Sequence, residues 1–130
     1  MTQEPTWLEP ATVQVMHRMV IAAHGGLAGL RDGALLESAV SRPRNRWLYE
    51  QAPLADLAAS LAFGLARNHA FIDGNKRVAF LAMVVFLERN GRRFTAGEAD
   101  ATVAILAVAD GSLSEADLGR WIADHSSVLV

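Results

Sequence analysis

Cysteine is absent from this chain of 130 residues. The absence excludes disulfide bonds, a catalytic thiolate and cysteine-ligated zinc sites. It also agrees with a reducing compartment, and we expect a cytoplasmic protein.

Long apolar runs are absent as well. The longest, from Val78 to Leu87, has ten residues, whereas a helix that crosses a bilayer needs about 20. The first residues, MTQEPTWLEP, contain acids and prolines where a secretory signal needs cations and an apolar stretch. We therefore expect neither export nor a membrane partner.

An excess of positive charge is missing too. Twelve basic residues against fourteen acidic ones give a formal net charge of -2, which provides no electrostatic footprint for nucleic acid. One basic stretch, residues 42–53, contains three arginines and Trp47, but Glu37 and Glu50 flank the arginines. We expect this stretch to be an exposed connection or flap, with no direct contact to nucleic acid.

A substantial core is predicted instead, since 52% of the residues are hydrophobic and only 20% are charged. A chain of this length is most simply one domain, residues 1–130. Helical spacing and cap residues predict about six helices and no sheet. Their approximate ranges are 13–24, 32–43 (entered near Asp32 and closed by Pro43), 54–68, 75–90, 98–110 (entered through a capping box at Thr95) and 115–125 (capped by Ser114). The fold class is thus a compact all-α bundle, and the nearly all-apolar helix 75–90 is predicted to be its centre.

The stretch HAFIDGNKR, residues 69–77, interrupts the apolar centre of the chain between two predicted helices. The first amides of the second helix have no partner within it, and its dipole places positive charge there. Lys76 and Arg77 add two cations to that end, where they oppose the dipole. An anion would neutralise both, and phosphate is the usual ligand of such sites; Gly74 lets it approach the backbone.

Asp73 and His69 extend this hypothesis. A carboxylate beside phosphate can hold Mg²⁺, which takes one or two protein carboxylates plus phosphate oxygens. Histidine exchanges its proton near neutral pH, so His69 is a natural general base for an acceptor hydroxyl. The alternative is that these residues have only structural roles. Asp73 would then cap a helix, His69 would end the preceding helix, and the two cations would lie on a solvated edge. The spacing alone leaves both interpretations open.

Two other histidines, His17 and His24, lie seven residues apart on the first predicted helix. Their spacing is not that of a helical metal chelate, which places its ligands four residues apart. We expect them to have core or surface roles.

The motif resembles the signature of the Fic/Doc superfamily, and most closely the form of its death-on-curing (Doc) branch, H-x-F-x-D-[AG]-N-K-R. The stretches HGGLAGLRDGALLESAVSRP (residues 24–43) and FLERNG (residues 86–91) are similar to the family as well. The AMP-transferring members have glycine in place of Lys76 and a second arginine in place of Phe80. Both departures match the Doc branch, which is a protein kinase.

The resemblance implies a role for each residue of the motif. His69 would deprotonate the acceptor serine or threonine, and Asp73 would bind Mg²⁺. Gly74, Asn75 and Lys76 would line the phosphate site of ATP, while Arg77 would clamp phosphate.

The resemblance also implies a biological role. The protein would be the toxin of a type II toxin–antitoxin pair, transferring the γ-phosphate of ATP to elongation factor Tu and so arresting translation. Its restraint would be a separate, Phd-like antitoxin, because the chain lacks the inhibitory [ST]-x-x-x-E-[GN] pattern. Two alternatives remain: an AMP transferase, and a catalytically silent module that only binds its antitoxin.

Overall fold

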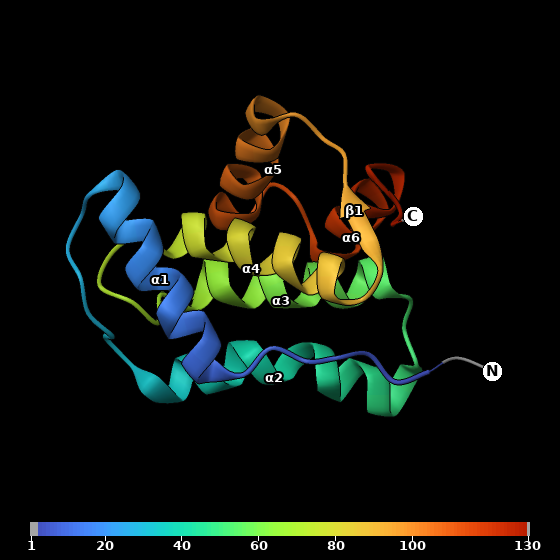
Figure 1. Ribbon diagram of the computed structural model, residues 1–130, viewed down its shortest axis with the longest axis horizontal. Helices are drawn as coiled ribbons and strands as arrows, with labels where there is room; N and C mark the ends of the chain where they lie inside the picture. The colour runs from blue at the N-terminus through green and yellow to red at the C-terminus, as the bar shows by residue number, and fades with distance from the viewer. Residues whose placement is uncertain (1–2, 130) are drawn as a thin grey trace.

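The computed structural model describes residues 3–129, which form six α-helices and one two-stranded antiparallel ribbon (Figure 1). The elements are α1 (Pro10–His24), α2 (Gly33–Glu50), α3 (Leu54–Asn68), α4 (Asn75–Arg89), β1 (Arg92–Phe94), α5 (Glu98–Asp110), α6 (Glu115–Asp124) and β2 (Ser126–Val128). The predicted bundle of about six helices is confirmed. The two strands were not predicted, because three residues are too few to show alternation of apolar and polar side chains. Within residues 3–129, no helix is long and apolar enough to span a membrane.

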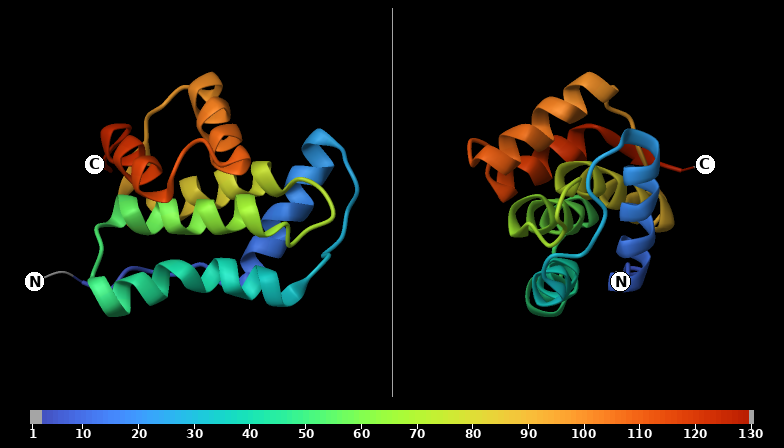
Figure 2. Two further views of the ribbon diagram at one scale, coloured as in Figure 1. Left: turned by 180° about the vertical axis from the view of Figure 1, so that it is seen from behind. Right: turned by 90° about the vertical axis from the view of Figure 1, so that its left-hand side faces the viewer.

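The centre of the bundle is α3, which packs against α2, α4 and α6 (Figures 1 and 2). Its residues 57–62 are buried without a break. The prediction that the helix beginning at Asn75 is the centre was wrong. On α4, Leu81, Val84 and Val85 are only half-buried, and Leu81 borders an open pocket, described below.

Helix α2 contradicts two predictions at once. It continues through Pro43, which was expected to close it, and reaches Glu50, so most of the predicted flap at residues 42–53 is helical. An interior proline costs a helix about 3 kcal/mol. Beyond it, however, Trp47 is buried to 8% exposure, and burying a large apolar side chain contributes a comparable amount, about 2–3 kcal/mol. Tertiary packing therefore overrides the local signal.

Two of the predicted helix caps are present, and one is not. The side chain of Asp32 accepts a hydrogen bond from the Leu35 amide, and that of Ser114 accepts one from the Asp117 amide. The capping box at Thr95 is wrong, since α5 begins at Glu98 without a side-chain cap. The Thr95 amide instead donates to the carbonyl of His125 (2.7 Å) and extends the ribbon.

The turn after α4 joins the two ends of the described chain. The side-chain amide of Asn90 makes two hydrogen bonds with the backbone of Thr6, at 2.8 and 3.0 Å. The neighbouring Gly91 carbonyl accepts from the amide of Leu129 (2.9 Å). Both ends therefore lie at the C-terminal end of α4, opposite the HAFIDGNKR motif (Figure 1).

Candidate active site

The motif forms the turn between α3 and α4 at one end of the bundle, beside the connection between α1 and α2 (Figure 2). We call residues 25–32 of that connection the α1–α2 loop. Its backbone pairs with the motif: the amides of Arg31 and Asp32 donate to the Ala70 carbonyl (2.7 and 3.0 Å), and the Ile72 amide donates to Gly29 (3.0 Å). The motif is thus held from one side by a loop about 40 residues away in sequence.

His69 follows the last residue of α3 and has a left-handed backbone, with φ 53° and ψ 48°. This conformation costs a residue with a side chain about 1–2 kcal/mol, so neighbouring groups must hold it. Arg31 does so: its Nε donates to the His69 carbonyl (2.6 Å), and its Nη2 donates to the Asn68 carbonyl (3.3 Å). Within residues 3–129 the exposed His69 ring makes no hydrogen bond, which leaves its nitrogens available to a ligand.

Replacing Arg31 with alanine is expected to lower the free energy of unfolding by about 1–3 kcal/mol, because two carbonyls at the end of α3 lose a charged donor. Urea unfolding of the variant measures the change. Arg31→Lys is the matched control, since it keeps the charge and can replace only part of the forked contact. Its free energy of unfolding should lie between those of Arg31→Ala and the parent protein. Equal stability of Arg31→Ala and the parent protein would contradict this function of the side chain.

Asp73 is exposed, and both of its carboxylate oxygens accept backbone hydrogen bonds. The Leu27 amide donates to Oδ2 (3.2 Å), and the Gly74 amide donates to Oδ1 (2.8 Å). The bond from Leu27, followed by the bond from Gly74, lowers the pKa of Asp73 below its ordinary value. The carboxylate therefore stays ionised as the pH falls to its ordinary pKa, and takes up a proton only below that.

The donor set around Asp73 suits a metal ion that is shared with a phosphate. A carboxylate has about four lone-pair sites, of which the two backbone bonds use two. Within residues 3–129, no cluster of three or more His, Cys, Asp or Glu could hold a metal without other ligands. A single carboxylate supplemented by phosphate oxygens is the usual coordination of Mg²⁺. Asp73 therefore fits Mg²⁺ that arrives with a phosphorylated ligand.

Phe71 and Asn75 fix the shape of the turn. Phe71 is 2% exposed, so its ring belongs to the core. The buried side-chain amide of Asn75 accepts from the Phe71 amide and donates to its carbonyl, both at 3.0 Å. The Asn75 side chain is thus occupied within the turn, which leaves its backbone amide for a phosphate.

Lys76 and Arg77 are exposed on the first turn of α4, after Gly74, whose φ is 76°. Neither forms a salt bridge within residues 3–129. The first helical hydrogen bond of α4 joins the Val78 amide to Gly74, so the amides of residues 75–77 precede its ladder. Two cations and three amides are therefore available to an anion at this end of α4.

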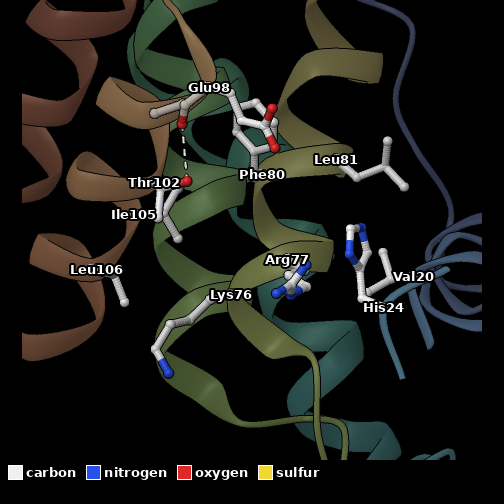
Figure 3. A pocket seen from close by; sticks show the side chains of 11 residues that line it. Val20, His24, Lys76, Arg77, Phe80, Leu81, Glu98, Thr102, Ile105 and Leu106 are labelled. Carbon is white, nitrogen blue, oxygen red and sulfur yellow. Dashed lines mark hydrogen bonds between the residues drawn. The ribbon is translucent and has the colours of Figure 1, made fainter. Parts of the chain in front are cut away.

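A pocket of about 470 Å³ extends from these cations between α1, α4 and α5 (Figure 3). Lys76 and Arg77 lie at one end of it, and the walls beyond them are largely apolar. The lining side chains labelled in the figure are Val20, His24, Lys76, Arg77, Phe80, Leu81, Glu98, Thr102, Ile105 and Leu106. His69 and Asp73 do not line this pocket, so the turn presents its polar groups on two adjoining surfaces.

His17 is a residue of this site that the sequence did not assign to it. It is 2% exposed on α1, and its Nε2 lies 2.7 Å from the backbone carbonyl of Asp73. The available signal was its spacing, because Val13, Met16 and Val20 place His17 on the apolar face of the helix. A polar group on a buried face requires a partner, but spacing does not identify that partner.

Comparison with known proteins gave one family and two curated relatives. Residues 7–87 match the model of the Fic/DOC family. Protein kinase doc of Escherichia phage P1 is 31% identical over 113 residues, which cover 79% of this chain and 90% of that protein. Toxin Doc of Mycolicibacterium smegmatis is 46% identical over 76 residues, or 57% of this chain and 58% of the relative.

Proposed function

Because this chain belongs to the Fic/Doc family and is a Doc-like kinase, we propose that it phosphorylates a serine or threonine hydroxyl of a translation factor. By resemblance to the Doc branch, that factor is elongation factor Tu, and its modification arrests translation. The observation that carries the proposal is the juxtaposition of an ionised Asp73 with two exposed cations, Lys76 and Arg77, at the start of α4. Such a set suits a metal-bound polyphosphate.

Each group then has a defined function. Asp73 would hold Mg²⁺, which neutralises charge on the phosphates when bound. Lys76, Arg77 and the backbone amide of Asn75 would hold the phosphate oxygens, and Gly74, whose own amide is bonded to Asp73, would let them approach the backbone. His69 takes the proton of the acceptor hydroxyl as its oxygen bonds to the γ-phosphorus of ATP and ADP departs.

Two positions favour phosphate transfer over AMP transfer. Lys76 stands where the AMP-transferring relatives have glycine, so its side chain occupies space next to the phosphates. Phe80 stands where they have a second arginine; its ring is half-buried and packs edge-to-face against Phe94, with 5.7 Å between centroids. An aromatic ring held in this way cannot clamp a phosphate.

ATP labelled either at the α- or at the γ-phosphorus tests the proposal, with purified elongation factor Tu as acceptor. We expect label on the factor from γ-labelled ATP and none from α-labelled ATP. Transfer of the α-label alone would identify an AMP transferase, and transfer of neither label would contradict both reactions for this acceptor.

The restraining partner is proposed to be a Phd-like antitoxin. The pocket between α1, α4 and α5 offers an apolar wall beside Lys76 and Arg77, and Leu106 at its edge is 49% exposed. A segment that folds into this pocket would cover both cations, so binding would exclude the nucleotide. Protection of the Lys76 amide from hydrogen exchange on adding the antitoxin would support this location, and unchanged exchange would oppose it.

A further inference from the structure

The ring of His17 is enclosed between α1 and the motif. It stacks on Phe71 with 3.9 Å between centroids and 8° between planes. Its Nε2 lies 2.7 Å from the Asp73 carbonyl, 56 residues away in sequence. Because a carbonyl oxygen only accepts hydrogen bonds, Nε2 carries the proton and donates it.

The bond from His17 controls more than one carbonyl, because the Asp73 carbonyl and the Gly74 amide belong to the same planar peptide group. One edge of this plane accepts from His17, and the other edge donates to Asp73 Oδ1 (2.8 Å). Rotation of the plane would break both bonds together. The orientation of the Asp73 carboxylate is therefore coupled to a side chain on α1.

The glycine that follows adds no side-chain restraint to this peptide. Gly74 has a φ of 76°, and a Cβ atom built there would lie 3.5 Å from His17 Nε2 and 3.3 Å from Ile21. A Cβ atom would need only a small shift of the Ile21 side chain, so glycine is required here for its positive φ rather than for space. Glycine also permits many other backbone conformations, and the hydrogen bond from His17 favours this one.

We propose that His17 is a positioning residue: by holding the Asp73–Gly74 peptide it orients the Asp73 carboxylate and the first turn of α4 toward the phosphate site. This inference rests on the proposed function of Asp73 in binding Mg²⁺. If the His17 ring only filled the core, an apolar ring would serve better, since burying a polar nitrogen costs free energy unless it is hydrogen-bonded.

Two variants separate the hydrogen bond from the packing. His17→Phe keeps a flat ring against Phe71 and removes the donor, whereas His17→Gln keeps a donor at similar reach. Val13→Ala, at a fully buried position of the same helix, controls for general loosening of α1.

The first measurement uses the protein without nucleotide or metal. By NMR we expect hydrogen exchange of the Gly74 amide to become about five- to tenfold faster in His17→Phe, as when one hydrogen bond is lost. His17→Gln should restore most of the protection, and Val13→Ala should not single out Gly74. Unchanged exchange at Gly74 in His17→Phe would overturn the proposal.

The second measurement is the dependence of phosphate transfer on Mg²⁺. His17→Phe should need about 10- to 100-fold more Mg²⁺ for half-maximal rate, the usual effect of removing a partner that orients a metal ligand. An equal shift in Val13→Ala and His17→Phe would reduce His17 to a packing residue. If the kinase assignment itself fails, no variant transfers phosphate, and the exchange measurement still decides whether His17 holds the peptide.

Discussion

His69→Ala is expected to lower the rate of phosphate transfer by about 10²–10⁴-fold, the usual contribution of a general base, and to abolish growth arrest when the protein is expressed. The ring of His69 is exposed and makes no hydrogen bond within residues 3–129, so its loss removes no packing. Transfer of the γ-phosphate to elongation factor Tu and the growth of expressing cells are the two measurements.

The left-handed backbone of His69 calls for a second variant. Alanine tolerates a φ of 53° poorly, whereas asparagine adopts such angles several times more often than other residues. His69→Asn therefore removes the base and keeps the turn, and it should lose as much activity as His69→Ala. Glu88→Ala, an exposed position near the far end of α4, should retain full activity.

The two His69 variants also show whether the protein acts as an enzyme or only as a binding module. Growth arrest that survives in both His69 variants would show that toxicity does not depend on the histidine, as expected if the protein acts only by binding. If His69→Ala lost activity and His69→Asn kept it in full, the loss would result from a changed backbone conformation and not from the missing imidazole.

Asp73→Asn is expected to lower the transfer rate at millimolar Mg²⁺ by about 10²-fold or more, since charge stabilisation by a metal contributes several kcal/mol and each 1.4 kcal/mol is a factor of ten. The substitution removes the charge at nearly constant size. Asparagine also has one acceptor oxygen where the carboxylate has two, so one of the bonds from Leu27 and Gly74 is lost. Rates measured across a range of Mg²⁺ concentrations provide the test.

Asp73→Glu is the matched variant because it keeps the charge on a longer side chain. Space for it is limited: a Cβ atom built at Gly26 would lie 2.7 Å from Asp73 Oδ2. We expect partial activity that requires more Mg²⁺ than the parent protein. If Asp73→Asn reached the rate of the parent protein at low Mg²⁺, the Asp73 carboxylate would not be a metal ligand.

The pH dependence of transfer gives Asp73 a further signature. Its pKa is lowered in the folded protein, so the carboxylate is already ionised above its ordinary pKa of about 4. Titration of Asp73 therefore contributes no loss of activity between pH 8 and about pH 5. A rate that falls in this range must follow another group.

The sequence predicted those parts of the molecule that depend on neighbours within a few residues. Asp32 and Ser114 cap helices by accepting from the amides three residues ahead of them, and the ends of α1 and α3 follow from the adjacent residues. Pro43 was misjudged because its local effect is outweighed by packing of Trp47 against other helices. The centre of the bundle was assigned to α4 on its apolar composition, although burial depends on how many neighbours surround a helix.

The motif identified the candidate site, but not what holds it in place. The contacts of Arg31 with His69 and of His17 with Asp73 span 38 and 56 residues. No periodicity encodes such pairs, because they depend on how α1 and the α1–α2 loop pack against the turn. Neither residue type nor spacing marks Arg31 as different from the other arginines of the chain.

The turn at Asn90 and Gly91, to which both ends of the described chain are bonded, has a practical consequence for experiments. Helix α4 separates this turn from the motif by 15 residues, or about 22 Å at 1.5 Å per residue. An affinity tag or fluorescent protein fused near either end of the described chain would therefore lie on the face turned away from His69. Labels for imaging or immobilisation can be attached there without obstructing the approach of a protein as large as a translation factor.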